Sequence, residues 1–510
     1  MSFFKTRPLL LIPVIFFFCF WTAHNWSGTS SKKRDCLVVN LGLLPTTLNP
    51  QFAQGSRDHF LASHLYEGLF RVGRGGKVVP GLAQHVSVSE DGLHYRITLR
   101  PSHWSDGTPL TAHDFVRSWQ GVLQPKKRFP ALGFHFRWIA GGSSPSLVAE
   151  DSQTLVFSLK QRVPYFLKLL ALPVFYPVLF DRNTFVSNGP FRLKQSDHFH
   201  EMVLEKNPFF WDQASVRLDQ LKIVYIEEQA QISLFEKGEI DVIGSQFVPL
   251  YAEEIKEKLL PSKKIFSTDH VSSISFIRVN TLKGGLRSRK IRQALSMCLN
   301  RQALSDLSSG LMPPAYRYLP PTVFPQGHVV RLEESVLRAR LLLEEGLREE
   351  GLVLSALGDL RLCCLHFCKN LAEAIQQQFL ENLGLTIKVD LLDLPDFFKR
   401  ISDGDFDLAL SRFISSYEDP YAFFDLFVCD RGGKSTWDSS LLHALFQKGL
   451  SLNEESRMLY VARMEQLLLD ELPVIPFSFG YCVYVVQPGL KGVLTNGLMT
   501  VDLSRAYWEE

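Results

Sequence analysis

The stretch that decides the fold is PGLAQHVSVSEDGLHYRITLRPSHWSDGTPLTAHDFVRSWQ, residues 80–120. Its centre, residues 94–100, alternates apolar and polar side chains with period two, which is typical of a half-buried β-strand. An Asp-Gly turn signal follows at residues 106–107. Thr111, with Asp114 three residues later, has the pattern of a helix N-terminus that is capped by side chains. The stretch therefore predicts a strand, a turn and a helix in close succession.

Strands and helices alternate in the same way along the rest of the chain. Period-two patterns predict strands at 36–39, 155–159, 221–226, 361–368, 386–392 and 406–413. Apolar residues at helical spacing predict helices at 163–173, 291–304, 333–350, 371–383 and 455–471. This order favours an α/β architecture in which mixed sheets are flanked by helices.

Composition limits the classes of protein to be considered. The chain has 510 residues, which suggests about three domains. With 55 Lys and Arg against 53 Asp and Glu, its net charge is +2, so it lacks the basic excess of a nucleic-acid binder. At 46% hydrophobic and 21% charged residues, it is not a globally disordered chain.

The N-terminus has the pattern of an export signal. Lys5 and Arg7 precede an apolar run at residues 9–21, and a polar segment follows. We interpret residues 1–31 as a signal peptide or an N-terminal anchor, and Cys19 is a candidate for lipidation. No later apolar run approaches the roughly 18 residues of a membrane-spanning helix. We therefore expect a periplasmic protein, either free or tethered to the inner membrane.

Catalytic and metal-binding patterns are missing or ambiguous. The sequence contains neither the G-x-S-x-G motif nor the H-E-x-x-H motif. Alternation along 361–368 would place Cys364, His366 and Cys368 on one strand face, which we interpret as core rather than as a metal site. His198 and His200 fit a solvated hairpin tip better than a metal site. We expect no catalysis, metal or cofactor, and an exported hydrolase remains the weaker alternative.

The deciding stretch, together with YEGLFRV at 66–72, resembles the solute-binding proteins of oligopeptide ABC importers, family 5 of the peptide/nickel type. Further similar segments follow in family order and spacing: VPYFLKLL (163–170), SNGPFRL (187–193), VLEKNPFFWD (203–212), FEKGEIDV (235–242), IRQALSMCLNR (291–301) and LPVIPF (472–477). Each motif is weak alone, but the ordered set covers nearly everything from Cys36 to the C-terminus.

The resemblance implies a periplasmic-binding-protein-like fold of class II, with two lobes, three domains and a hinge between the lobes. The implied division is domain I at 36–64, 188–280 and 487–510, domain II at 65–187, and domain III at 281–486. It also implies a ligand site between the lobes. The residues expected there are Gln54, Ser56, Phe276, Asn280, Phe413, Ser416, Tyr417, Glu418 and Asp419.

Several expected site positions depart from the family pattern. An aspartate that pairs with the peptide α-amino group in the family is replaced by Ser416, although Glu418 and Asp419 are close by. The arginines that receive peptide carboxyl groups are replaced by Ile401 and Leu410, with Arg400 and Arg412 adjacent. A cysteine pair of some members is replaced by Ser273 and Ile414.

The resemblance implies a monomeric binding component that delivers oligopeptides to the permease subunits of an ABC importer. Nucleic acid is not an expected partner. The altered site leaves an alternative with the same fold and transport role but a specialised cargo, which would be a cell-wall muropeptide, a nickel complex or haem. A buried ligand charge needs a partner, and Ser416 does not supply one.

Overall fold

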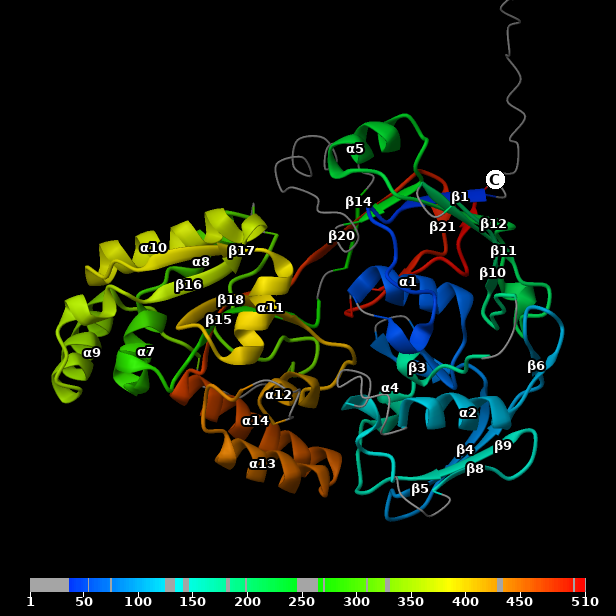
Figure 1. Ribbon diagram of the computed structural model, residues 1–510, viewed down its shortest axis with the longest axis horizontal. Helices are drawn as coiled ribbons and strands as arrows, with labels where there is room; N and C mark the ends of the chain where they lie inside the picture. The colour runs from blue at the N-terminus through cyan, green and yellow to red at the C-terminus, as the bar shows by residue number, and fades with distance from the viewer. Residues whose placement is uncertain are drawn as a thin grey trace, which may run out of the picture.

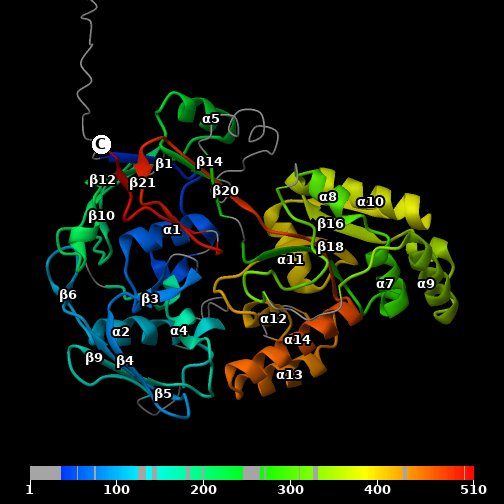
Figure 2. The ribbon, with the colours of Figure 1, turned by 180° about the vertical axis from the view of Figure 1, so that it is seen from behind.

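The computed structural model describes residues 36–53, 55–73, 76–123, 134–140, 146–179, 184–197, 200–244, 265–268, 271–308, 311–325, 331–428, 434–498 and 500–509. The predicted signal segment, Gln54 and His198 lie outside the described residues. The chain forms two lobes side by side (Figure 1, Figure 2). We call the lobe with the seven- and four-stranded sheets lobe 1, and the lobe with the five-stranded sheet lobe 2.

The large sheet of lobe 1 has the order β10-β11-β12-β1-β13-β20-β14. Its strands are β1 (Cys36–Asn40), β10 (Phe191–Ser196), β11 (Glu201–Lys206), β12 (Gln220–Val224), β13 (Val242–Gly244), β14 (Ile265–Thr268) and β20 (Cys482–Val486). β1 runs parallel to β12 and β13, whereas the other pairs are antiparallel. Helices α1 (Gly55–Leu65) and α5 (Glu228–Glu236) belong to the same lobe.

The deciding stretch supplies two strands of the four-stranded sheet, and the strand predicted at 94–100 is one of them. That sheet has the order β4-β5-β9-β8, with β4 (Ala83–Val88), β5 (His94–Leu99), β8 (Leu147–Ala149) and β9 (Thr154–Ser158). Tyr95, Ile97 and Leu99 point into the core. The Thr111 backbone N–H donates to the Asp114 carboxylate (2.8 Å) at the start of α2 (Ala112–Leu123). This confirms the predicted helix cap.

Short elements complete lobe 1. They are β2 (Phe70–Val72), β3 (Val78–Pro80), β6 (Ser102–His103), β7 (Pro109–Leu110), α4 (Phe166–Leu169), β21 (Leu490–Lys491), β22 (Leu494–Thr495), β23 (Val501–Asp502) and β24 (Tyr507–Trp508). The helix predicted at 163–173 is thus only the four residues of α4, followed by the 3₁₀ turn Pro173–Phe175. The C-terminal strands return beside β1 (Figure 1).

Lobe 2 is built on the sheet β17-β16-β18-β15-β19. Its strands are β15 (Ser273–Val279), β16 (Arg361–Leu365), β17 (Lys388–Leu392), β18 (Leu408–Ile414) and β19 (Val474–Phe479). Its helices are α7 (Arg289–Met297), α8 (Arg301–Asp306), α9 (Val336–Glu349), α10 (Lys369–Leu383), α11 (Leu394–Asp403), α12 (Tyr421–Val428), α13 (Ser440–Leu450) and α14 (Glu454–Glu471). The further 3₁₀ turns of the chain are Pro50–Phe52, Gln213–Ser215, Gly284–Arg287, Leu354–Leu357 and His366–Cys368.

Two predictions for lobe 2 are wrong in detail. The single helix at 291–304 is two helices, because the Asn300 side chain accepts a hydrogen bond from the Ala303 N–H and starts α8 anew. The strand at 361–368 stops at Leu365, because residues 366–368 turn into a 3₁₀ helix. His366 and Cys368 therefore do not continue the strand face of Cys364.

The chain crosses between the lobes twice, in opposite directions. It leaves the large sheet after β14 and enters the lobe 2 sheet as β15, and it returns from β19 to β20. We propose from this sheet membership that lobe 2 runs from residue 273 to 479. The division expected from the family placed β15 in domain I and β20 in domain III, so the proposed boundaries lie a few residues earlier in both places.

Candidate functional site

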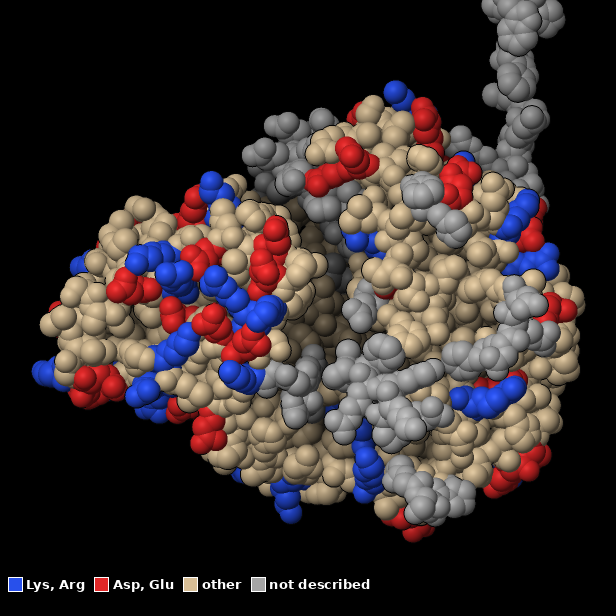
Figure 3. Space-filling model, in the orientation of Figure 1, with Lys and Arg blue, Asp and Glu red and all other residues tan. Residues whose placement is uncertain are grey.

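The surface is hollowed between the two lobes (Figure 3). The end of β18 and the turn that follows it, residues 413–419, include the lobe 2 residues Tyr417, Glu418 and Asp419 that contact lobe 1, and we call this segment the interlobe wall. The turn is fixed by its own polar groups: the Ser415 hydroxyl bonds to the backbone of Tyr417, and the Tyr421 N–H donates to the Asp419 carboxylate (3.1 Å). Pro420 then precedes α12. Hydrogen bonds between residues close in the sequence therefore fix this turn, and Asp419 lies just before the helix.

Asp419 is fully occupied by protein partners. Only 1% exposed, it receives two hydrogen bonds from the Arg457 guanidinium, at 2.9 and 3.0 Å. The Lys168 ammonium of lobe 1 lies 3.3 Å away, and it also donates to the Glu418 carbonyl oxygen at 2.6 Å. A two-pronged buried ion pair of this kind orders the turn. Asp419 has no solvent-accessible oxygen to offer a ligand.

Glu418 differs from its neighbour in burial and pairing. Its carboxylate is half-buried and packs against the backbone of Gly76, where a side chain would collide with it. Burial raises the pKa of Glu418, while the Lys168 charge and a hydrogen bond from the Gly497 N–H lower it. Within the described part of the chain, Glu418 forms no ion pair. Among the described residues, it is thus a carboxylate between the lobes that no cationic side chain pairs within salt-bridge distance.

Tyr417 is a contact between the lobes. It is 3% exposed, its ring stacks on Tyr165 of lobe 1 (5.2 Å between centroids), and its hydroxyl donates to Asp425 (2.8 Å). Arg137 of lobe 1 donates to the other oxygen of Asp425, also at 2.8 Å. Burial and the Asp425 charge raise the pKa of Tyr417 well above its usual value. The phenol therefore stays neutral and holds the lobes together.

The other expected site residues are distributed over three places. Phe413 is half-buried and meets Phe423 edge-on at 5.2 Å, and Ser416 is half-buried in the turn. Phe276 lies 4% exposed on β15. Ser56 is half-buried in the first turn of α1 in lobe 1.

The Asn280 side chain fixes the loop at residues 404–406 by hydrogen bonds. Its amide donates to the carbonyl oxygens of Gly404 and Phe406 (3.1 and 3.0 Å), and its own oxygen accepts from the Leu282 N–H. The structure thus gathers residues 413–419 into one wall, whereas Asn280 lies at the far end of β15 from that wall.

Sequence reasoning missed the lobe 1 residues that meet the wall. Lys168, Arg137 and Tyr165 come from segments whose functional partners lie more than 200 positions away in the chain. Lys168 and Tyr165 do belong to the VPYFLKLL motif, which was the available signal. Gly76 belongs to a glycine-rich loop whose packing against Glu418 only the fold reveals.

Residues 273 and 414, which replace a cysteine pair of some members of the resembling family, lie at the hinge. Ser273 of β15 lies directly opposite Ile414 of β18 in the register, so the two positions are neighbours in space. On its other side, Ser273 touches Gly480, where a Cβ atom would lie 2.5 Å from the Ser273 Cβ. The Gly480 N–H donates to the Ser273 carbonyl oxygen (3.0 Å). The two crossing segments are therefore in direct backbone contact.

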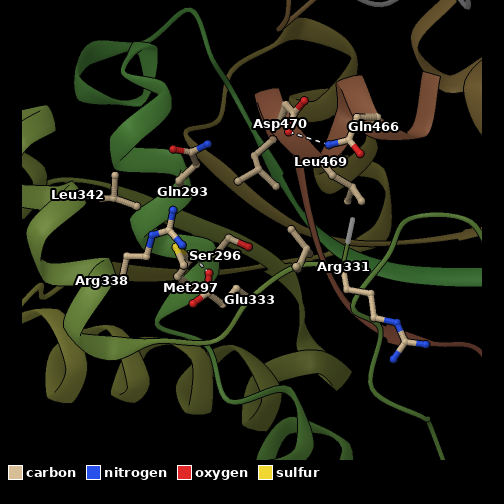
Figure 4. Close-up of a pocket in the computed structure, with 12 residues that line it drawn as sticks. Gln293, Ser296, Met297, Arg331, Glu333, Arg338, Leu342, Gln466, Leu469 and Asp470 are labelled. Atoms are coloured by element: carbon tan, nitrogen blue, oxygen red, sulfur yellow. Dashed lines mark hydrogen bonds and ion pairs between the residues drawn. The ribbon is translucent and has the colours of Figure 1, made fainter. Parts of the chain in front are cut away.

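A separate pocket of about 150 Å³ opens within lobe 2 (Figure 4). It is lined by residues of α7, α9 and α14 and by the segment 331–333. Among its polar side chains, Arg338 forms an ion pair with Glu333 (2.7 Å), and the Gln466 amide donates a hydrogen bond to Asp470 (2.9 Å). The interlobe wall contributes no residue to this pocket.

Two features are absent from the described residues. None of their His, Cys, Asp and Glu side chains gather in groups of three that could hold a metal ion. None of their helices is both long and apolar enough to cross a membrane.

This architecture, with two lobes around a hollow and two crossing strands as a hinge, defines a binding protein of the two-lobed kind. The family model for bacterial extracellular solute-binding proteins, family 5, matches residues 77–435. The chain belongs to this family.

Curated relatives match over almost the whole chain. The chain is 27% identical to the oligopeptide-binding protein OppA of Bacillus subtilis, covering 96% of this chain and 95% of the relative. It is 25% identical to the periplasmic murein peptide-binding protein MppA of Escherichia coli, covering 96% of both chains.

Solved structures share the fold. The murein tripeptide binding protein MppA of Escherichia coli aligns with a TM-score of 0.79 at 23% identity, covering 93% of this chain and 98% of the other. OppA of Haemophilus influenzae, in complex with the peptide RPPGFSPFR, aligns with a TM-score of 0.79 at 20% identity, covering 94% and 99%.

Proposed function

We propose that this chain binds oligopeptides between its two lobes and delivers them to the permease of an ABC importer. The observation that carries the proposal is the similarity over 96% of the chain to peptide-binding proteins of the same family. The hinge supports it, because closure of the lobes buries the ligand and creates a shape that a permease can distinguish. The chain acts as a monomer and as a binder rather than an enzyme.

We further propose that Glu418, rather than Asp419, pairs with a cationic group of the ligand. Asp419 is committed to Arg457 and Lys168, whereas Glu418 is half-buried between the lobes with no ion pair among the described residues. Closure would bring a ligand ammonium into contact with a partly desolvated carboxylate, which strengthens the pair. This would compensate for Ser416, which carries no charge.

The test is native mass spectrometry of the exported form after gentle purification, with released ligands identified. A ladder of mixed peptides is the expected result, and a protein that retains no peptide and takes up none from mixed pools would contradict the function. Glu418→Gln is expected to weaken peptide binding about 10- to 100-fold. Glu455→Gln, on the exposed start of α14, is the matched control. Equal affinity of the Glu418→Gln variant and wild type would remove Glu418 from the site.

A second candidate is a specialised cargo, namely murein peptide. The observation in its favour is the alignment with murein peptide-binding protein MppA, combined with the uncharged Ser416. A single discrete ligand mass that matches a murein tripeptide would support this cargo. Tight binding of ordinary free tripeptides, lost in Glu418→Gln, would rule it out.

We propose a periplasmic location, in which the N-terminal segment 1–31 is removed, is retained as an anchor, or carries a lipid on Cys19. The intact mass of the exported protein distinguishes the three, because cleavage, retention and lipidation give different N-terminal masses.

A further inference from the structure

Three lobe 1 side chains converge on one segment of lobe 2, residues 417–425, which runs from the interlobe wall into α12. They are Arg137, which forms an ion pair with the segment, Tyr165, which stacks on it, and Lys168, which donates hydrogen bonds to two of its oxygens. Both ribbon views place α4 next to α12 where the lobes meet (Figure 1, Figure 2). We call the three side chains and the segment the latch.

The latch is packed by the protein itself. Tyr165, Tyr417 and Asp425 are 1%, 3% and 1% exposed. The Tyr165 ring also lies 5.5 Å from the Tyr421 ring, so the aromatic contact continues into α12. Closely packed rings around a charged hydrogen-bonded pair are features of a protein interface with a dry centre. Because protein atoms already fill it, the latch is complete without a ligand.

Separating the lobes would be costly at Asp425. Its carboxylate takes an ion pair from Arg137 of the other lobe, and the two side chains are 1% and 22% exposed. Asp419 differs, because Arg457 of its own lobe pairs with it however the lobes are placed. Removing one partner of a buried ion pair leaves a charge that burial penalises. The pair of Arg137 with Asp425 therefore favours the arrangement in which the lobes touch.

The latch includes the carboxylate that we propose as the partner of a ligand cation. Glu418 lies inside the segment 417–425, and Lys168 donates to its carbonyl oxygen at 2.6 Å. On the other side, its carboxylate packs against Gly76 of lobe 1. The contacts that join the lobes thus also position Glu418 between them. A ligand that meets this arrangement already formed does not have to supply the free energy of closure.

We propose that the latch holds the two lobes together in the ligand-free protein, so that the protein's own contacts close the lobes before a peptide binds. Arg137 and Lys168 are then positioning residues, which act on affinity through the segment 417–425. Only this effect on affinity rests on the proposed function, because the ligand-free conformation involves no peptide. If fewer molecules are closed, the apparent dissociation constant rises by the inverse of the closed fraction.

Small-angle X-ray scattering of the full exported chain, stripped of retained peptide and checked by native mass spectrometry, tests the latch. We expect wild type to keep its radius of gyration when a mixed pool of two- to five-residue peptides is added. The double variant Arg137→Gln with Lys168→Gln should have a larger radius without peptide and should contract when the pool is added. Contraction of wild type on peptide addition, or a ligand-free double variant as compact as wild type, overturns the latch.

Peptide affinity gives a second measurement. The double variant should bind the pool about 10-fold more weakly than wild type, because about a tenth of its molecules are closed. The matched control is Arg96→Gln with Lys194→Gln, which removes the same two charges from ion pairs within lobe 1. This control should scatter and bind as wild type does, and an equal loss in both double variants would contradict the latch.

A milder variant covers failure of the double variant to fold. Lys168 is 37% exposed, so Lys168→Gln alone should fold and should show a smaller increase in the ligand-free radius. No increase in this variant counts against the latch. A wild-type protein that binds no peptide refutes the proposed function, whereas the ligand-free comparison of wild type with the variants still decides whether the latch closes the lobes.

Discussion

Two regions of lobe 2 carry charge that is stabilised in opposite ways. In one the charge is buried and paired, and in the other it is exposed and has no ion pair among the described residues. In the turn at 415–419, the Asp419 carboxylate is 1% exposed and held by Arg457 and Lys168. At the hinge end of the sheet, Arg412 contacts the Ser275 hydroxyl and the Met312 sulfur and forms no ion pair among the described residues. The contrast teaches that the buried charge of the wall is matched by protein partners, whereas the exposed charge at the hinge end has no ion pair among the described residues.

The largest expected effect concerns the satisfied charge. Asp419→Asn should reduce the free energy of unfolding by about 3–5 kcal/mol, because it leaves the buried Arg457 without its main partner. Urea unfolding of the purified variant measures this loss. Glu454→Gln is the control: this residue also touches Arg457 but is 69% exposed, so its loss should cost less than about 1 kcal/mol. Similar losses in the two variants would show that burial does not decide how much each carboxylate partner of Arg457 contributes to stability.

A third group, the buried carboxylate of Glu67 in lobe 1, is poorly paired. We expect its effect on the free energy of unfolding to be intermediate. Glu67 is 4% exposed, and its nearest cation, Arg71, is 4.0 Å away. Burial raises the pKa of Glu67 to about 7, opposed by the Arg71 charge. Because the folded pKa lies above the unfolded value, Glu67 stabilises the fold fully below about pH 4.5 and loses this contribution as pH rises through about 7.

The free energy of unfolding should therefore fall by about 2–4 kcal/mol between pH 4.5 and 8 through Glu67. Urea unfolding across this range, compared with Glu67→Gln, isolates the effect, since the variant should show a flatter profile. Parallel pH profiles for the variant and wild type would show that Glu67 ionises normally.

The hinge provides a test that involves packing rather than charge. Gly480→Ala places a Cβ 2.5 Å from the Ser273 Cβ, and we expect overpacking to cost about 1–3 kcal/mol in the free energy of unfolding. The double variant Gly480→Ala with Ser273→Gly removes the clash and should recover part of the loss. No recovery in the double variant would mean that the two crossing segments do not press on each other at this point.

The smallest expected effect concerns the lobe contact. Tyr417→Phe removes the hydrogen bond to Asp425 but keeps the ring against Tyr165, so the loss should be about 1 kcal/mol. A double-mutant cycle with Arg137→Gln measures the coupling, because both groups bond to the same carboxylate. Independent, additive effects would show that Asp425 does not link the lobes.

Much of the fold was predictable because its signals are local. The alternation at 94–100 and the cap formed by Thr111 and Asp114 each depend on a few neighbouring residues, and the structure confirms both. Where a short signal competed with a longer pattern, prediction failed. The apolar stripe through 291–304 suggested one helix, but the Asn300 cap divides it.

The candidate site was predictable only in part, for the same reason. The wall at 413–419 follows from a motif in one continuous segment. Whether each carboxylate in it is free or paired depends on Arg457 and Lys168, which the sequence places far from residue 419. The contact of Arg412 with Ser275 likewise depends on β18 and β15 being neighbours in the sheet, which no spacing in the chain indicates.

The sequence by itself determined the α/β class, the order of most elements and the family, because periodicity, caps and ordered motifs are properties of short segments. Only the tertiary structure decided which of two adjacent carboxylates, Glu418 or Asp419, forms ion pairs among the described residues. The physical reason is that the charge available to a ligand depends on desolvation and on partners brought together from distant segments, and both exist only once the lobes have packed.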